Sequence, residues 1–313
     1  MKILVTGGAG FIGSNIIDVL VDNDYEVHTV DNLSTGKREN VNERAFFHYV
    51  DIRSPELNGV FEKVKPDIVI HHAAQIDIQF SLKKPTLDAD INVLATISLL
   101  ELCVKHKVTK IIYASSAAVY GAPKYLSVDE EHPVSPISFY GISKLTPEYY
   151  IKVYSELYGL KYTILRYANV FGLRQDPKGE GGVVSIFLNK LNRNEPVTIF
   201  GDGEQTRDFI YVKDIALANL AAITNGENDT FNISNNKTVS INQLYQCMTR
   251  LSSQSVEPIY KNERLGDIKH SCLDNRKAME QLDWKPQFTL QEGLEETYRY
   301  YTEGELACLA EQN

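Results

Sequence analysis

The sequence predicts an α/β fold, in which a smaller mixed α/β lobe is attached to a doubly wound parallel Rossmann sheet. Three observations support this prediction. Short apolar runs alternate with longer amphipathic ones through the first half of the chain. A glycine-rich turn joins the first apolar run to the first amphipathic one. After residue 172 the elements become shorter and the regular alternation ends.

Six apolar runs in the first half are predicted strands. They are rich in Val, Ile, Tyr and Phe, and several are apolar on both faces, as strands covered by helices on both sides must be. The predicted strands are "KILVT" (2–6), "EVHTVD" (26–31), "AFFHYV" (45–50), "DIVIHHA" (67–73), "KIIYASS" (110–116) and "YTILRY" (162–167).

Helical patterns separate these strands, which favours parallel strand pairing with helical crossovers. We expect these helices at 11–23, 55–64, about 86–106 and about 138–158. Beyond a Gly-rich loop at 173–182, we expect helices near 183–193, 212–224, 240–251, 274–282 and 290–302, and strands at 197–200 and 229–234. We therefore predict a Rossmann domain at 1–170 and a smaller lobe at 171–313, with the chain re-entering the first domain near 202–225.

The composition indicates an ordinary globular protein, with 43% hydrophobic and 23% charged residues among 313. A formal net charge of −9 argues against a general nucleic-acid or membrane-surface binder. No apolar run approaches the roughly 18 residues of a membrane helix, and the N-terminus lacks a secretory leader, so we expect a cytoplasmic protein. The cysteines are scattered, which predicts reduced thiols and no metal site. They are Cys103, Cys247, Cys272 and Cys308.

The stretch "VTGGAGFIG" predicts a dinucleotide-binding turn. Gly7, Gly10 and Gly13 lie between the first strand and the first helix, where glycines let a pyrophosphate approach the backbone and the helix N-terminus. Asp31 ends the second strand, where a carboxylate accepts hydrogen bonds from ribose hydroxyls and repels a 2′-phosphate. The sequence therefore predicts NAD rather than NADP as the cofactor.

Five other polar positions near the predicted strands leave alternatives open. Asp51 fits either an acceptor for the adenine amino group or a turn cap. His71 and His72 point to opposite faces of their strand, so they cannot chelate one metal, and they are packing or cofactor-wall residues. Lys37 and Arg38 would suit a 2′-phosphate, although solvated loop charges are the favoured interpretation.

The stretch "SFYGISK" holds a Tyr and a Lys that are four positions apart on a predicted helix. Tyr140 and Lys144 therefore share a helix face, either as a surface pair or as an acid–base pair. In the second case the Lys ammonium lowers the pKa of the Tyr from about 10 toward neutrality, which creates a general base for an alcohol. Ser115 and Ser116 leave the fifth strand at the ligand-binding edge of such sheets.

These motifs together give the chain a specific family resemblance. The chain resembles the extended short-chain dehydrogenase/reductase superfamily and, within it, the nucleotide-sugar 4-epimerases, most closely the UDP-glucose 4-epimerases. The similarity spans nearly the whole chain. It rests on "VTGGAGFIGSN", "DNLSTG", "DIR", "HHAAQ", "ASSAAVYG", "YGISK", "LRYANVFG", "GDGEQTRDFIYVKDIA" and "LDW".

The resemblance implies a role for individual positions of this chain. The catalytic group would be Tyr140, Lys144 and Ser116. The cofactor positions would be Gly7, Gly10, Phe11, Ile12, Gly13, Asp31, Asn32, Asp51, Ile52, Ala73, Asn92, Tyr140, Lys144 and Tyr167. The UDP-sugar would be held, largely by the lobe at 171–313, through Ser116, Tyr140, Asn169, Val183, Arg207, Arg264, Asp267 and Ser271.

The activity implied by the resemblance is 4-epimerisation of UDP-hexoses with bound NAD, through a transient 4-keto sugar. Related dehydratases and decarboxylases carry extra acids beside the serine, where this chain has Ala117 and Ala118. A UDP-uronate 4-epimerase or a UDP-sugar dehydratase is the alternative activity. A non-catalytic NAD-binding scaffold is disfavoured because Tyr140 and Lys144 are both present.

Three further expectations follow. Pro147 should kink the catalytic helix, because it lacks an N–H and crowds the Ser143 carbonyl. Ser271 stands where a bulky Tyr restricts related enzymes to plain hexoses, so this chain should also accept N-acetylated UDP-hexoses. The resemblance implies a homodimer formed by the helices near 86–106 and 138–158. Candidate apolar contacts are Ile97, Leu100, Val104, Tyr149 and Val153.

Overall fold

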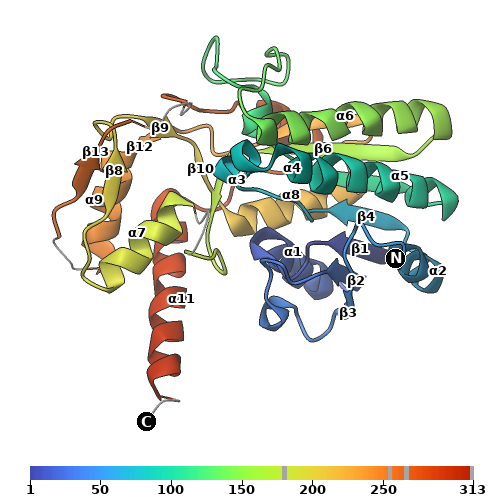
Figure 1. The fold of residues 1–313 in the computed structure, drawn as a ribbon, viewed down its shortest axis with the longest axis horizontal. Helices are drawn as coiled ribbons and strands as arrows, with labels where there is room; N and C mark the ends of the chain where they lie inside the picture. The colour runs from blue at the N-terminus through green and yellow to red at the C-terminus, as the bar shows by residue number, and fades with distance from the viewer. Residues whose placement is uncertain (178–181, 253–255, 264–267, 311–313) are drawn as a thin grey trace.

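The computed structural model describes residues 1–177, 182–252, 256–263 and 268–310, with side chains described as far as residue 303. Its centre is a seven-stranded parallel sheet in the order β11-β6-β5-β4-β1-β2-β3 (Figure 1). The strands are β1 (Lys2–Thr6), β2 (Glu26–Asp31), β3 (Phe46–Tyr49), β4 (Ile68–His71), β5 (Lys110–Ser116), β6 (Lys161–Tyr167) and β11 (Asp229–Ile233). The strand order reverses between β1 and β4, which confirms the predicted doubly wound α/β fold.

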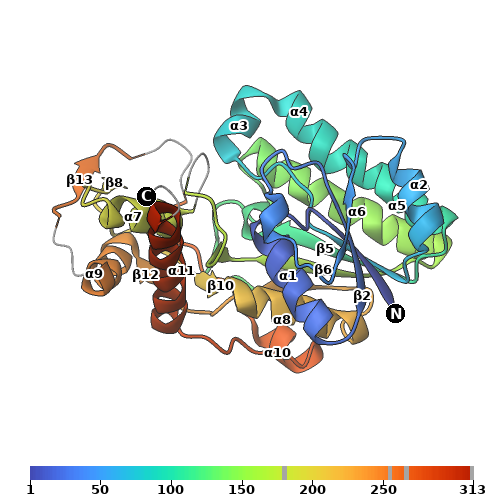
Figure 2. The same cartoon turned by 90° about the horizontal axis from the view of Figure 1, so that it is seen from below.

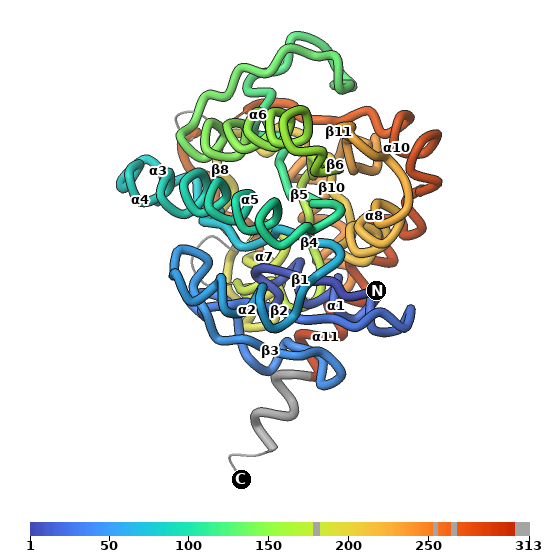
Figure 3. The backbone as a smooth tube through the Cα atoms, turned by 90° about the vertical axis from the view of Figure 1, so that its right-hand side faces the viewer, coloured from blue at the N-terminus to red at the C-terminus, as the bar shows by residue number. Residues whose placement is uncertain are grey.

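Helices bury both faces of this sheet, which explains the continuous apolar runs in the sequence. Within β1, Ile3 and Val5 join the core on one face and Leu4 joins the core on the other. The first face is covered by α1 (Phe11–Asp22), α8 (Val212–Thr224) and α10 (Arg276–Gln281). The second face is covered by α2 (Leu57–Val64), α5 (Ala95–Lys105) and α6 (Phe139–Tyr158). Figure 3 shows the two groups of helices on opposite sides of the strands.

The single helix expected near 86–106 is divided in the structure. The chain forms α3 (Ile78–Lys83), α4 (Pro85–Ala89), a π-helical turn η2 (Asp90–Leu94) and then α5. Pro85 begins α4 because a proline at the first helical position loses no helix hydrogen bond. Leu100 is fully buried in the sheet core, so its proposed role as an exposed dimer contact was wrong.

Helix α6 has clear sequence signals at both ends. The Ser138 side chain accepts a hydrogen bond from the Gly141 N–H at the start, and Gly159 at φ 71° follows the last residue. Pro147 lies inside the helix, yet α6 runs without a break from Phe139 to Tyr158. The proline therefore removes one hydrogen bond without ending the helix.

The second part of the molecule has a core of its own beside the sheet (Figure 2). Its elements are α7 (Val183–Asn192), β8 (Thr198–Phe200), β9 (Thr206–Arg207), β12 (Val239–Ser240), α9 (Ile241–Ser252), β13 (Ile259–Lys261) and α11 (Leu290–Ala310). Phe187, Leu191 and Leu244 are buried in this core. Helix α11 continues to residue 310, beyond the expected end at 302.

The chain crosses between the two parts several times. Strands β7 (Asn169–Phe171) and β10 (Phe209–Tyr211), which were not expected, pair in parallel at the junction. After the first elements of the lobe, the chain returns to the sheet with α8 and β11. It leaves again through α9 and returns once more with α10. The division at residue 170 stays a prediction.

The described residues also bear on membrane and metal binding. No described helix is both long and apolar enough to cross a membrane. Within the same residues, no three His, Cys, Asp or Glu side chains gather closely enough to hold a metal ion.

Candidate functional site

The glycine-rich turn lies between β1 and α1, at the edge where the parallel strands end. Gly7 has φ +73°, and a Cβ there would come within 2.6 Å of the Ala73 backbone nitrogen. A Cβ on Gly13 would lie 2.3 Å from the Gly7 carbonyl oxygen. Glycine is therefore required at both positions by close backbone approach.

The first turn of α1 offers backbone N–H groups to a ligand. Gly10 precedes the helix and has no side chain to cap it. Among the described residues, the N–H groups of Phe11, Ile12 and Gly13 have no acceptor. Three free N–H groups at the positive end of a helix form an anion site, which fits the pyrophosphate of a dinucleotide.

The Asp31 carboxylate anchors this turn. Its Oδ2 accepts a hydrogen bond from the Ala9 N–H at 2.9 Å, and its Oδ1 accepts one from the Leu33 N–H at 2.8 Å. Asp31 is buried at the end of β2. A carboxylate has about four lone-pair positions, so it can still accept a ribose hydroxyl. The expected ribose role remains a prediction.

Asp51 is held in an ion pair that the sequence analysis missed. Arg53 donates through Nε and Nη2 to the Asp51 carboxylate at 3.0 and 2.7 Å, and through Nη1 to Asp90 at 3.1 Å. Asn32 donates to the same carboxylate at 2.8 Å. These hydrogen bonds, chiefly those from Arg53, hold the pKa of Asp51 well below its usual range.

The hydrogen bonds of Asp51 address whether it caps a turn or accepts the adenine amino group. Its Oδ1 accepts the Arg53 backbone N–H at 2.8 Å, which is the geometry of a turn cap.

Ile52, the neighbouring cofactor candidate, is buried in the sheet core.

His71 ends β4 and contacts Tyr113 of the second core, whereas His72, the next residue, contacts Tyr167 of the first core, so the two rings lie on opposite sides of the sheet as expected. His71 is fully enclosed between the Thr6 and Thr96 hydroxyls, at 2.7 and 2.8 Å, which supports the packing interpretation. Burial lowers the pKa of each His to about 3, so both are neutral.

His72 leaves one buried polar atom unpaired beside two cofactor candidates. Its Nε2 lies 3.0 Å from the Tyr167 hydroxyl, which accepts a hydrogen bond from Asn219 at 2.8 Å. Its Nδ1 is buried without a partner among the described residues. A bound cofactor that supplied an acceptor here would relieve the cost of this unpaired atom. Ala73, the next residue, donates its N–H to the Thr6 hydroxyl at 3.2 Å.

Asn92 connects three elements at the rim of the predicted cofactor site. It lies in the π-helical turn, accepts the Gln75 N–H at 2.8 Å, and donates to the Ser143 hydroxyl on α6 at 2.9 Å. Its side chain is almost fully buried and already bonded within the protein. The structure thus gives Asn92 a clear bridging role, and cofactor contact remains a prediction.

The three catalytic candidates come together at the start of α6. The Ser116 and Tyr140 side chains lie close enough together for Ser116 to lower the pKa of Tyr140. Lys144 lies one turn further along α6, is 5% exposed, and places its Nζ 4.9 Å from the centre of the Tyr113 ring. The three side chains place two hydroxyl groups beside a buried cation. Such an arrangement suits proton transfer to or from an alcohol substrate.

The expected lowering of the Tyr140 pKa is not seen in the structure, where this pKa is raised. Burial raises this pKa, the hydrogen bond from Ser116 lowers it in part, and the negative charge of Asp88 raises it. Lys144 is not among the groups that shift it. The spacing of Tyr140 and Lys144 in the sequence reveals neither the burial of Tyr140 nor the charge of Asp88 beside it.

Lys144 is itself perturbed by its surroundings. Burial lowers the pKa of Lys144 to about 8, and the carboxylates of Asp88 and Glu148 oppose this change. The ammonium therefore remains mainly protonated at neutral pH and begins to lose its charge in mildly alkaline solution.

The predicted substrate positions fall into two groups. Asn169 and Val183 line one small hollow at the junction of the two parts, together with Gln175 and Phe209. Arg207 lies on β9, where Nη1 donates to the carbonyls of Thr206 at 2.9 Å and Lys269 at 3.3 Å. Arg264 and Asp267 lie outside the described residues.

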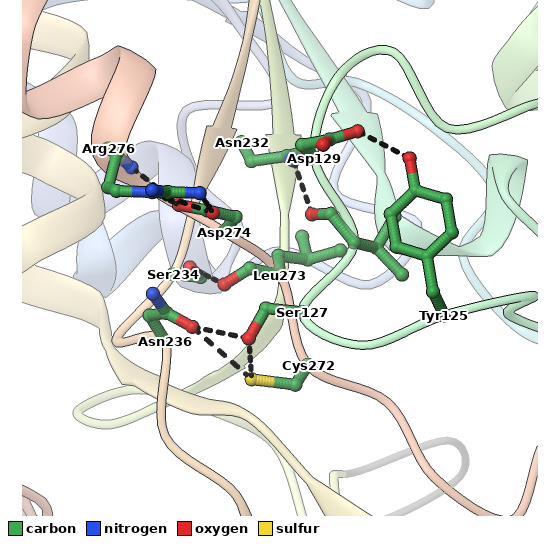
Figure 4. Close-up of polar contacts among 11 residues, drawn as sticks. Tyr125, Ser127, Asp129, Asn232, Ser234, Asn236, Cys272, Leu273, Asp274 and Arg276 are labelled. Atoms are coloured by element: carbon green, nitrogen blue, oxygen red, sulfur yellow. Dashed lines mark hydrogen bonds and ion pairs between the residues drawn. The ribbon is translucent and has the colours of Figure 1, made fainter.

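Ser271 is half-buried and held in a fixed segment next to Arg207. Its N–H donates to the Thr206 carbonyl at 3.1 Å. The following Cys272 is buried, with its Sγ 3.3 Å from the Ser127 hydroxyl (Figure 4). Val128 pairs with Leu273 in the same region. These contacts disfavour the interpretation of Ser271 as a surface-loop residue.

A second hollow was not anticipated from the sequence. It lies where β8 and β13 meet the segment leading to β9, and it is lined by Phe200, Gly201, Asp202, Gln205 and Lys269, among others. Gln205 is two residues from Arg207, so the hollow is continuous in sequence with a predicted substrate position. The only sequence signal was the unusual "FGDGEQTR" turn.

Comparison with known proteins gives consistent results. Residues 3–234 match the family described as the NAD dependent epimerase/dehydratase family. The UDP-glucose 4-epimerase of Mycolicibacterium smegmatis is 37% identical over 96% of this chain and 98% of its own. The UDP-glucose 4-epimerase of Thermotoga maritima, solved with UDP-glucose, is 44% identical, with a TM-score of 0.96 over 97% of this chain and 100% of its own.

A third similar structure carries a different substrate in its name. It is the UDP-N-acetylglucosamine 4-epimerase of Methanobrevibacter ruminantium in complex with UDP-N-acetylmuramic acid. It is 36% identical, with a TM-score of 0.92 over 97% of this chain and 98% of its own.

The glycine turn supports a direct test of the cofactor site. We predict that Gly13→Ala lowers the amount of NAD retained on purification, because the new Cβ meets backbone atoms of Gly7 and Gly8. A clash in a packed turn costs roughly 1–3 kcal/mol, which corresponds to about tenfold or more in affinity. Nucleotide released by denaturation is assayed for NAD and NADP.

Gly59→Ala is the matched control for this experiment, since a Cβ at Gly59 would meet nothing within 4 Å. It should keep the wild-type NAD content. Equal retention of NAD by Gly13→Ala would contradict the proposed turn, and release of NADP alone from the wild type would contradict the preference for NAD expected from Asp31.

Proposed function

Because this chain belongs to the NAD-dependent epimerase/dehydratase family, we propose that it is an NAD-dependent 4-epimerase of UDP-hexoses. The observation that carries this proposal is the meeting of Tyr140, Ser116 and the buried Lys144 at the carboxyl edge of the sheet. The free N–H groups of α1 lie at the same edge and suit the pyrophosphate of the cofactor.

The proposed chemistry assigns each catalytic side chain a step. Tyr140 removes the proton from the sugar 4-hydroxyl and later returns a proton to the same oxygen. Ser116 holds that hydroxyl and the Tyr140 oxygen together through hydrogen bonds. Bound NAD would supply a reversible acceptor for the hydride of C4, and the positive charge of its oxidised ring would favour the phenolate form of Tyr140. Lys144 adds a second positive charge near this site.

The surroundings of Ser116 favour a reaction limited to C4. The next two residues are Ala117 and Ala118, which carry no acid or base. Elimination at the adjacent carbons would need a second acid–base pair near the sugar. We therefore propose epimerisation rather than dehydration.

The UDP group would be anchored by the second part of the molecule while the sugar turns over. Asn169, Val183 and Arg207 are the described candidates, with Arg264 and Asp267 as further ones. An Arg guanidinium binds phosphate oxygens through its planar fork of N–H donors. Binding energy from this remote group would retain the intermediate during catalysis.

The function is tested by incubating the purified protein with UDP-glucose, UDP-N-acetylglucosamine and UDP-glucuronate and separating the products. We expect UDP-galactose from the first. Tyr140→Phe should lower kcat by about 10²–10⁴-fold, because it removes the acid–base hydroxyl. Its affinity for UDP-glucose should change little.

Activity with UDP-glucuronate alone would reject the proposed hexose substrate. Near-normal turnover by Tyr140→Phe would reject the assigned base even if the enzyme is an epimerase.

We also propose that the enzyme acts on UDP-N-acetylglucosamine and UDP-N-acetylgalactosamine. The support is the small side chain of Ser271, in a segment fixed by the Thr206 carbonyl and the buried Cys272. Ser271→Tyr should therefore lower activity on the N-acetylated pair by about tenfold or more, since overpacking costs roughly 1–3 kcal/mol. Activity on the plain pair should remain.

The ratio of kcat/KM for the two sugar pairs is the measurement for Ser271. Ser271→Ala serves as the control and should keep the wild-type ratio, because it adds no volume. An unchanged ratio in Ser271→Tyr would exclude Ser271 as the residue that sets substrate breadth.

The partner we propose is a second copy of this chain, bound through α6. Ile142, Tyr149, Val153 and Leu157 recur at helical spacing along α6 and are 48–68% exposed. A stripe of this kind on a helix face indicates an interface. We predict a dimer by light scattering at micromolar concentration.

The dimer prediction has its own variant. Val153→Glu should yield a monomer, because it would bury two like charges across the symmetric contact. A wild-type protein that is already monomeric would contradict the proposed partner.

A further inference from the structure

A buried carboxylate that the proposed chemistry does not use lies beside the catalytic group. Glu148 is on α6, four residues beyond Lys144, and is 1% exposed. The Ser115 hydroxyl donates to its Oε1 at 2.5 Å, and Arg166 donates to Oε1 through Nε at 3.0 Å and to Oε2 through Nη2 at 2.6 Å. Burial of the Glu148–Arg166 ion pair costs desolvation free energy, so its presence beside the catalytic group needs a physical explanation.

The two partners of Glu148 occupy matching positions in the sheet. Ser115 on β5 and Arg166 on β6 are register partners, and the next pair along the strands is Ser116 and Tyr167. Glu148 therefore holds both strands one residue before their catalytic and cofactor candidates. Through α6 it connects the same strands to Tyr140 and Lys144.

Pro147, the residue before Glu148, makes the contacts between α6 and the sheet more important. Pro147 has no N–H to donate to the carbonyl of Ser143, so the helix between Tyr140 and Glu148 lacks one of its internal hydrogen bonds. Arg166 extends the connection on the other side, donating to the Tyr120 hydroxyl at 2.9 Å. This part of α6 is thus fixed by contacts with the sheet.

We propose that Glu148 is a positioning residue, which fixes Tyr140 and Lys144 against Ser116 and Tyr167 through its bonds to Ser115 and Arg166. The inference rests on the proposed function, because it assigns a role in the same site. Glu148 does not touch the sugar or the cofactor in this proposal.

A second effect of Glu148 is electrostatic. Among the described residues, the titratable groups around Lys144 are Tyr140, one turn earlier on α6, Glu148 on α6, Asp88 on α4, Tyr113 on β5, His71 at the end of β4 and His72 directly after it. Asp88 and Glu148 both raise the pKa of Lys144 against the effect of burial, and Asp88 alone also raises that of Tyr140. Loss of the Glu148 charge should make Lys144 release its proton at lower pH. The unpaired Arg166 would act in the same direction.

The test compares Glu148→Gln with the wild type by two measurements. The first is an NMR titration of isotope-labelled lysine, in which Lys144 is identified as the signal missing from Lys144→Met. We expect its pKa to fall by about one unit in Glu148→Gln. The second is the pH profile of UDP-glucose turnover. We expect kcat to fall by about tenfold or more with little change in KM, and its alkaline limb to move to lower pH.

Two control variants separate this role from a purely structural one. Asp214→Asn alters a buried carboxylate that accepts the N–H groups of Gln287 and Phe288 and is not among the groups that shift the pKa of Lys144. It should leave the Lys144 titration and the pH profile unchanged even if it lowers Tm. Asp88 raises the pKa of both Tyr140 and Lys144, so Asp88→Asn should move both the acid and the alkaline limb of the pH profile to lower pH. Glu148 raises only the pKa of Lys144, so Glu148→Gln should move only the alkaline limb.

The outcomes are distinguishable. An unchanged Lys144 titration and unchanged kcat in Glu148→Gln, or equal changes in Asp214→Asn, would overturn the proposal. If Glu148→Gln does not fold, Ser115→Ala decides, with a fall in kcat at constant KM expected and wild-type kcat overturning the role. A wild type inactive on all UDP-sugars would reject the proposed function, whereas the NMR titration would still report on Glu148.

Discussion

Burial of the parallel sheet on both faces is the constraint on which the rest of the structure depends. Because helices cover each face, the strands are apolar throughout, and polar side chains are concentrated where strands end. All strands of a parallel sheet end at the same edge, so residues from β1, β2, β4, β5 and β6 meet there without any long loop. The glycine turn, Asp31, Ser116 and Tyr167 owe their proximity to this single geometric fact.

The sequence predicted the features that depend on local pattern. The six strands of the first half, the glycine turn and the catalytic helix follow from apolar runs, glycine spacing and capping residues such as Ser138. The π-helical turn at 90–94 could not be predicted, because it is stabilised by bonds from Asn92 to Gln75 and Ser143, which are distant in sequence. The short strands β7 and β10 likewise need partners that no local pattern reveals.

The electrostatics of the site were the least accessible to sequence reasoning. Spacing alone paired Lys144 with Tyr140, but burial is the largest influence on the pKa of Tyr140, and Ser116 and Asp88 shift it further in opposite directions. The Glu148–Arg166 pair joins residues on separate elements and has no signature in either segment. A reactive site of this kind therefore depends on buried charges outside the recognisable motif, since desolvation and pairing decide which groups stay ionised.

The repeated crossing of the chain between its two parts has a consequence for biosynthesis. Strand β6 ends at Tyr167, but its outer neighbour β11 begins only at Asp229, after α7 and α8 have been made. During translation the growing sheet therefore presents an apolar, unpaired edge until that later segment emerges from the ribosome. Such edges are the sites at which nascent chains aggregate or recruit chaperones. Lys161 at the start of β6 is the one exposed charge of that strand, and the residues after it are buried in the folded protein, so little protects that edge before β11 arrives.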